Sequence, residues 1–218
     1  MLCCTVVVSK TFSDHGMDFN FSCIQPNNPR WVQVFKKISA QQNYDRWYKN
    51  VCDKSSLKLY VQFKTHPYLE SYLKDKLDFY GASLKFKARS NTLPLNGKLS
   101  SWEVNNDGMC LLCKSGCEDI NHFMLSCKSL HAIRDNELHN LKLNLRRADL
   151  SYVWNFFSVS DNNTQLCLIL GNTCLNVTPM VSKYSYDDTL IEKQFDAFCK
   201  SYLKRAWSCR TALLSNNN

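Results

Sequence analysis

The alternation of hydrophobic and polar positions predicts a chain built mainly from helices. From Arg30 onwards, apolar residues fall at the i, i+3, i+4 and i+7 positions of an amphipathic helix: Trp31, Val34, Phe35 and Ile38. The same spacing predicts helices at about 44–51, 67–79 and 82–90, with Gly81 ending the helix that begins at 67. Residues 57–63 alternate apolar with polar side chains, so this stretch is expected to be either extended or helical.

The second half of the chain continues the helical pattern. Pro94 stops the helix over 82–90, and a short β-hairpin is expected over 97–109. Helices are predicted at 122–145 and 149–159, followed by a polar turn at 160–163 and a short apolar segment at 164–177. Asp187 is expected to cap a last long helix, roughly 188–214. The predicted fold class is therefore mainly α, a bundle-like helical domain with one short β-hairpin.

The composition indicates a globular protein whose charge is unevenly distributed along the chain. The chain has 218 residues, of which 44% are hydrophobic and 12% aromatic, enough to bury a core. The net charge is +8, and residues 30–99 alone hold fourteen Lys and Arg against five Asp and Glu, a balance of +9. Aromatic side chains are interleaved with these cations, a combination that can bind phosphates by charge and bases by stacking. A solvated basic surface on ordinary helices has the same composition.

Candidate metal-binding residues are concentrated between Cys110 and Cys127. The spacing C-x2-C-x8-H-x4-C is formed by Cys110, Cys113, His122 and Cys127. One nitrogen and three sulfur ligands make a full tetrahedral set for zinc, and since no position is left open for water, the set indicates one structural ion. The expected bundle therefore includes a small CCHC zinc knuckle.

Two other ligand sets fit the spacing. Cys117 could replace His122. Alternatively, His131 could replace His122 and complete a set with Cys110, Cys113 and Cys127. Coincidence in a chain of twelve cysteines is a further alternative. Because the first eight residues lack a basic n-region and no run approaches the ~18 apolar residues of a spanning helix, we expect an intracellular protein, nuclear or cytoplasmic, with reduced cysteines.

The residues around this motif resemble a known family. The run 84–97, LKFKARSNTLPLNG, precedes the C-x2-C pair, and NHFMLSC at 121–127 with Arg134 follows it. This order is similar to the zinc-binding region near the C-terminus of non-LTR (LINE-type) retrotransposon reverse transcriptases, clearly over about 57–140. The chain departs from the family at Lys128, where proline is common, and between Gly97 and Cys110, where the usual basic residues are missing.

The resemblance implies a zinc ion and a nucleic-acid partner, either RNA or DNA. The residues expected to contact nucleic acid are Lys85, Lys87, Arg89, Lys98 and Arg134. No membrane and no small-molecule substrate are expected as partners. The alternative is a protein-interaction or structural remnant of a transposon, whose basic face is merely solvated.

No catalytic residue is predicted. The polymerase core of the resembled proteins has no counterpart here, and the carboxylates at Asp187 and Asp188 follow the zinc motif instead of preceding it. They suit the positive end of a helix dipole. The sequence offers no Gly-rich phosphate loop and no nucleophile elbow.

The predicted organisation has five parts. Residues 1–29 form a weakly structured lead-in and 30–100 a basic helical region. The zinc knuckle and its following helix occupy 101–145, C-terminal helices occupy 146–214, and 215–218 form a tail.

Overall fold

The computed structural model describes residues 29–54, 57–64, 69–74, 77–103, 106–171 and 185–215. The chain divides into two compact units, Met1–Lys54 and Ser55–Asn218. The lead-in predicted at 1–29 lies almost entirely outside the described residues, as do the end of the apolar segment at 164–177 and the last three residues.

In the first unit, α2 (Pro29–Cys52) is a single helix where two were predicted. No glycine or proline occurs between Arg30 and Cys52, so nothing in the sequence interrupts the backbone hydrogen bonds. Towards its C-terminal end Tyr44 lies against Trp47 and Tyr48, with ring centroids 5.8 and 6.0 Å apart.

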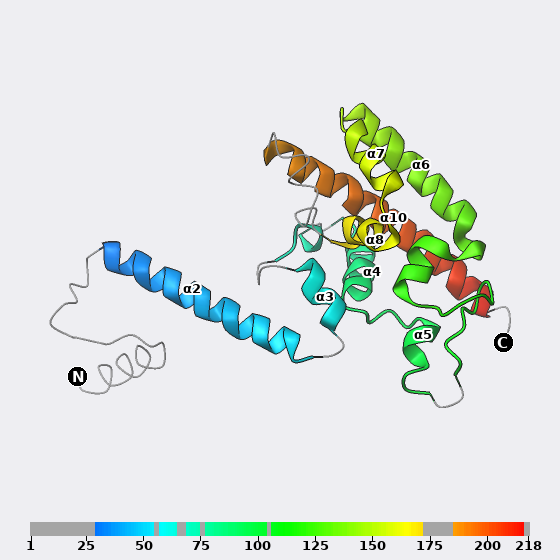
Figure 1. Ribbon diagram of the computed structural model, residues 1–218, viewed down its shortest axis with the longest axis horizontal. Helices are drawn as coiled ribbons and strands as arrows, with labels where there is room; N and C mark the ends of the chain where they lie inside the picture. Colours follow the sequence, from blue (N-terminus) through cyan, green and yellow to red (C-terminus); the bar gives the residue numbers. More distant parts are fainter. Residues whose placement is uncertain are drawn as a thin grey trace. The chain divides into compact units, whose positions relative to one another are not determined.

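The second unit is a stack of helices crossed by one long helix (Figure 1). Its N-terminal part holds α3 (Lys58–Phe63), the 3-10 turn η3 (Ser71–Leu73), α4 (Phe79–Arg89) and α5 (Asn96–Leu99). The π-helical turn η4 (His122–Ser126) and the 3-10 turn η5 (Lys128–Leu130) lead into α6 (His131–Arg147). The remaining helices are α7 (Ser151–Val159), α8 (Asn162–Leu170) and α10 (Ser185–Ser215).

Helix α10 organises the core of this unit, because α4, α6 and α8 all pack against it. Its buried side includes Phe195, Tyr202 and Leu203, which meet apolar side chains from the other helices. Those partners are Leu84 and Ala88 of α4, Leu141 and Leu145 of α6, Val153 and Phe157 of α7, and Leu166 and Ile169 of α8. Burying these side chains is the main stabilising contribution to the fold.

Several predicted helix boundaries are wrong. Gly81 does not end a helix but lies in the first turn of α4, where its amide donates to the capping carboxylate of Asp78 at 3.0 Å. A Cβ at position 81 would lie 2.6 Å from that carboxylate, so glycine leaves room for the cap. Helix α10 begins at Ser185, which places Asp187 inside its first turn and not at the cap.

The expected β-hairpin at 97–109 is also wrong for the described residues of that segment. Asn96–Leu99 is helical, and the one antiparallel bridge recorded pairs Met109 with Cys117. Side-chain hydrogen bonds take the place of a strand ladder: the amide of Asn96 donates to the Met109 carbonyl at 2.8 Å and accepts from Asn106 at 2.7 Å. The mainly helical fold class is confirmed, but two predicted helices are wrong. Before α4 begins at Phe79, the described residues of 67–79 contain only the 3-10 turn η3, and the stretch predicted as one helix at 122–145 is divided into η4, η5 and α6, because Cys127 leaves the helical region with a ψ of 120°.

No helix within the described ranges combines the length and apolar character needed to cross a bilayer.

Candidate metal centre

The first two cysteines of the motif lie on a tight loop closed by backbone hydrogen bonds. The amide of Cys110 donates to the Gly116 carbonyl, and the amide of Lys114 donates to the Cys110 carbonyl, both at 2.9 Å. Lys114 and Gly116 adopt φ angles of 52° and 80°, the left-handed region that lets so short a loop close. The loop brings the thiols of Cys110 and Cys113 to one side.

The other two candidate ligands are His122, the first residue of the π-helical turn η4, and Cys127, which directly follows that turn. The Asp119 carboxylate accepts from the His122 amide at 2.7 Å and starts the turn, and the Cys127 amide donates to the His122 carbonyl at 2.8 Å. In an α-helix, residues five apart point about 140° away from each other. The wider i→i+5 turn brings His122 and Cys127 to the same side, which an H-x4-C spacing in a regular α-helix does not do.

These four side chains converge on one point. Their ligating atoms all lie within 4.8 Å of one another. The Cys110 and Cys127 sulfurs are 3.8 Å apart, and the Cys113 sulfur is 3.2 Å from Nε2 of His122. Tetrahedral zinc with ordinary bond lengths requires separations of about 3.8 Å for two sulfurs and about 3.6 Å for sulfur and nitrogen. The donor set therefore fits zinc.

The geometry brings together one of the predicted ligand sets. Cys117 is exposed and its thiol is outside the cluster. The His131 side chain is 68% exposed and lies 3.1 Å from Asp135 on the same helix. His122 thus completes the set that the structure brings together.

Neighbouring groups hold the ligands in place. Nδ1 of His122 lies 3.4 Å from the Ser126 hydroxyl. If Nε2 holds a metal ion, Nδ1 would carry the proton and donate to that hydroxyl. The guanidinium of Arg134 donates to the Cys127 carbonyl at 3.1 Å, and the Tyr202 hydroxyl donates to the Phe123 carbonyl at 2.7 Å. Helices α6 and α10 are in this way tied to the segment that carries these two candidate ligands.

Comparison with known families agrees with this geometry. Residues 63–133 match the family model described as zinc-binding in reverse transcriptase. The match contains α4, α5 and all four clustered ligands, and it lies inside the stretch where the sequence resemblance was clear. No curated protein and no solved structure matches the chain significantly. We refer to residues 63–133 below as the zinc-binding region.

Within the zinc-binding region, the three cysteines differ in acidity before metal binds. Burial raises the pKa of Cys110, and burial together with the neighbouring Cys110 raises the pKa of Cys127 to about 12. Burial opposes ionisation of Cys113 as well, but hydrogen bonds from Ser115 and contacts with Cys110 and His122 lower its pKa to about 6. Cys113 is therefore the thiolate available first to an incoming cation.

This difference predicts a steep pH dependence of zinc binding. At pH 7 Cys113 is already ionised, whereas Cys110 and Cys127 carry protons that zinc must displace. Release of about two protons weakens the apparent affinity by about a hundredfold for each pH unit lost, because protons compete for the ligands. Competition with a chromophoric chelator between pH 7 and 8 measures this slope, and an affinity that does not vary with pH would contradict the ligand assignment.

A buried ion pair lies beside the candidate metal centre. The sequence did not predict it. Glu118 is fully buried and accepts two hydrogen bonds from the Arg210 guanidinium, at 2.9 and 2.8 Å. Its carboxylate also accepts a hydrogen bond from the backbone amide of Asn96 at 2.6 Å and lies 3.9 Å from the Cys110 sulfur. Glu118 thus links α5, the cysteine loop and the C-terminal half of α10.

Gly97 allows α5 to approach this loop closely. Its amide donates to the Glu118 carbonyl at 3.1 Å. A Cβ at position 97 would lie 2.6 Å from the Cys117 sulfur and 2.9 Å from the same carbonyl, so a side chain would push the loop away.

The five residues expected to contact nucleic acid fall into two groups. Lys85, Arg89 and Arg134 are buried and bonded to protein groups. Lys85 pairs with Asp196 at 2.9 Å, and Arg89 donates to the Phe63 carbonyl at 2.8 Å and lies 3.4 Å from Glu70. Arg134 holds the Cys127 carbonyl, as described above. Their position favours a structural role.

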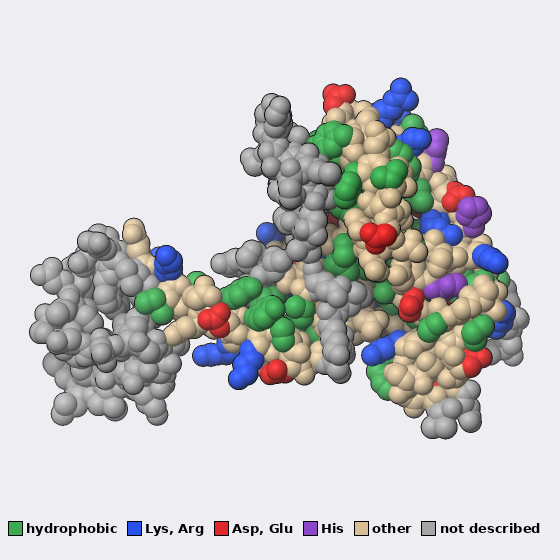
Figure 2. Space-filling view, in the orientation of Figure 1, with side chains coloured by type: hydrophobic (Ala, Val, Ile, Leu, Met, Phe, Trp, Pro, Cys, Tyr) green, Lys and Arg blue, Asp and Glu red, His purple; other side chains and the backbone are tan. Residues whose placement is uncertain are grey.

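Lys87 and Lys98 form the second group, and solvent can reach both. Lys87 lies exposed in the last turn of α4. The ammonium of Lys98 lies 5.1 Å from the ring centroid of Trp102, an aromatic side chain that is 71% exposed. Sequence reasoning did not single out Trp102, although Lys98 and Trp102 are four residues apart, the spacing of neighbours on one helical face. On the visible face of the second unit, Lys and Arg side chains are dispersed among other types (Figure 2).

Proposed function

We propose that the chain is a nucleic-acid-binding module stabilised by one structural zinc ion, without a catalytic activity of its own. The observation that supports this most strongly is the closed set of three cysteines and one histidine inside a region that matches zinc-binding in reverse transcriptase. Cys110, Cys113, His122 and Cys127 would hold the ion, which supplies a cross-link between the cysteine loop and the turn leading into α6. All four positions are protein groups, so the metal has a structural role.

The accessible cations and one aromatic ring indicate where nucleic acid would bind. Lys87 and Lys98 can each neutralise a phosphate, and the exposed ring of Trp102 offers a face on which an unpaired base can stack. We therefore assign the contacts to Lys87, Lys98 and Trp102. We assign a structural role to the three buried cations, Lys85, Arg89 and Arg134.

Charge reversal at the accessible lysines tests the proposal. The double variant Lys87→Glu/Lys98→Glu is expected to bind single-stranded RNA or DNA at least tenfold more weakly and to lower the slope of log affinity against log salt by about 1.4, because two phosphate contacts are lost. Trp102→Ala is expected to cost about 1–3 kcal/mol of binding energy through lost stacking. Fluorescence anisotropy with labelled oligonucleotides over a salt series measures both.

Lys193→Glu is the matched control, since this lysine is exposed on α10 outside the zinc-binding region. It should alter the affinity much less than the double variant does. Unchanged binding in the double variant and in Trp102→Ala would reject the assigned contacts. No salt-dependent binding by the wild type would reject the nucleic-acid function and favour a protein-interaction module.

A further inference from the structure

Helix α4 buries its cations and exposes its aromatic rings. Lys85 and Arg89 are only 2% and 0% exposed. By contrast, Phe79 is 81% exposed, Tyr80 is 55% exposed and Phe86 is 41% exposed. An amphipathic helix of a soluble protein normally places its rings against the core and its cations in solvent. The exposed rings therefore mark a candidate interaction surface.

The exposed rings lie on one face of α4. At about 100° per residue, Phe79, Ser83 and Phe86 form one row along the helix. Tyr80 and Lys87 form the row beside it, and all of these side chains except the half-buried Ser83 are exposed. This outward face of α4 thus combines three rings with the accessible cation Lys87.

A contact with α3 restrains one of these rings. The centroid of the Phe86 ring lies 6.3 Å from that of Tyr60, and the two ring planes meet at 73°. This edge-on packing holds the Phe86 side chain in position while part of its surface stays open to solvent. An ordered ring loses less conformational entropy than a mobile one when a ligand stacks on it.

The charge on the outward face of α4 complements a phosphate backbone. Lys87 is its one charged residue, and the helix contains no acid. Asp78, which precedes the helix, pairs with Lys204 at 2.8 Å. A nucleic-acid strand offers both groups that this surface can bind, since its bases stack on aromatic rings and its phosphates pair with cations.

These rings are accessible to unpaired bases only. In a duplex each base is covered above and below by its neighbours, so a side chain on a helix surface cannot stack on it. Phe79 and Phe86 are separated by two helical turns, about 10.5 Å along the axis. One stacked strand advances by about 3.4 Å per nucleotide, so the two rings can hold different bases of one strand.

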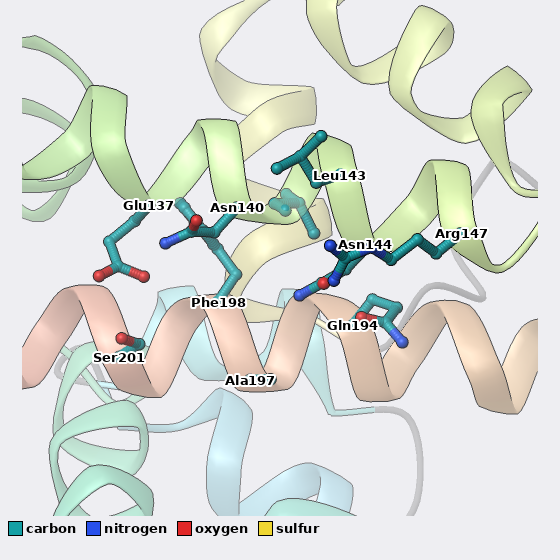
Figure 3. A pocket seen from close by; sticks show the side chains of 10 residues that line it. Glu137, Asn140, Leu143, Asn144, Arg147, Gln194, Ala197, Phe198 and Ser201 are labelled. Carbon is teal, nitrogen blue, oxygen red and sulfur yellow. The ribbon is translucent and has the colours of Figure 1, made fainter.

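The groove between α6 and α10 offers no comparable surface (Figure 3). Phe198, the aromatic residue that lines it, is only 5% exposed, so neither face of its ring is open to a base. The other side chains labelled there are polar or aliphatic. Open rings beside a cation are therefore a property of the α4 face and not of this groove.

We infer that the outward face of α4 binds single-stranded nucleic acid, with bases stacked on Phe79, Tyr80 and Phe86 next to the phosphate contact at Lys87. This inference rests on the proposed nucleic-acid function. It adds a second stacking surface to the one at Trp102, and it specifies an unpaired strand as the ligand.

The double variant Phe79→Leu/Phe86→Leu tests the inference. Leucine keeps the apolar bulk, removes the rings and favours helices, so the variant should fold normally. We expect it to bind single-stranded RNA or DNA at least tenfold more weakly, with an unchanged slope of log affinity against log salt, because stacking is lost and no phosphate contact is. Phe79→Tyr/Phe86→Tyr is the matched control, since it keeps both rings and should bind as the wild type does.

An oligonucleotide with abasic sites separates stacking from other contacts. It keeps the phosphates but offers no bases, so the wild type and the leucine variant should bind it equally. The inference would be overturned, with the proposed function left intact, if the leucine variant bound the normal strand as tightly as the wild type or lost as much affinity for the abasic strand. Absence of salt-dependent binding by the wild type would reject both.

Discussion

Replacing Arg210 with alanine is expected to lower the free energy of unfolding by about 3–5 kcal/mol, because it leaves a buried carboxylate unpaired. Glu118 is completely shielded from solvent, and its two oxygens accept from the Arg210 guanidinium at 2.9 and 2.8 Å. No other cation is recorded as an ion-pair partner of Glu118 among the described residues. The stranded charge must be neutralised or must draw water into the core.

Urea unfolding of the reduced, zinc-loaded protein measures this loss. Arg146→Ala is the control, because Arg146 is exposed on α6 and its removal should change the unfolding free energy by less than about 0.5 kcal/mol. The pair Glu118→Gln/Arg210→Met removes both charges and keeps an acceptor for the Asn96 amide, so it should lose less stability than Arg210→Ala. Equal stability of Arg210→Ala and the control would show that the pair does not form.

Loss of a metal ligand is expected to have the second large effect. Cys127→Ser should abolish stoichiometric zinc binding, with a larger loss of affinity than the 10–100-fold typical of outer-shell changes. Cys127 is fully buried, and its sulfur lies 3.8 Å from that of Cys110. Without the ion, no metal cross-link joins the side chains of the cysteine loop to those of His122 and Cys127, so the zinc-binding region should unfold at a lower temperature.

Cys117→Ser provides the comparison for this variant. Cys117 is an exposed cysteine of the same loop, and its sulfur lies outside the cluster. It should keep one zinc per chain and a melting temperature close to that of the wild type. If Cys117→Ser lost zinc and Cys127→Ser retained it, the ligand set would have to be redrawn around Cys117.

The cluster of Cys110, Cys113, His122 and Cys127 was one of the ligand sets predicted from sequence, because its spacing is local, but the spacing did not distinguish it from sets that include Cys117 or His131. A C-x2-C loop and a histidine five residues before a cysteine specify most of the geometry, and only the π-helical turn that aligns His122 with Cys127 was not anticipated. Most helices also formed where their hydrophobic period predicted them, but in the periodic stretch at 67–79 the described residues before Phe79 formed only the short turn η3, and several helix ends differed from the prediction. Gly81 suggested a helix end by its residue type, but the cap of Asp78 determined its place inside α4.

Local sequence could not predict which basic side chains are buried and which are exposed. Lys85 is buried by an ion pair with Asp196, 111 positions later, and Glu118 by a pair with Arg210, 92 positions later. A local charge pattern identifies a cation but not an acid that folding brings beside it. Lys85 and Arg89 were expected at the surface because their partners, Asp196 of α10 and Glu70, are distant in the sequence.

Metal analysis of the reduced, purified full chain, combined with circular dichroism before and after chelation, tests the central claim most directly. We predict one zinc ion per chain, lost on chelation together with part of the helical signal, and absent from Cys110→Ser, His122→Ala and Cys127→Ser. A folded wild-type protein that contains no zinc and gains no stability when zinc is added would contradict the account.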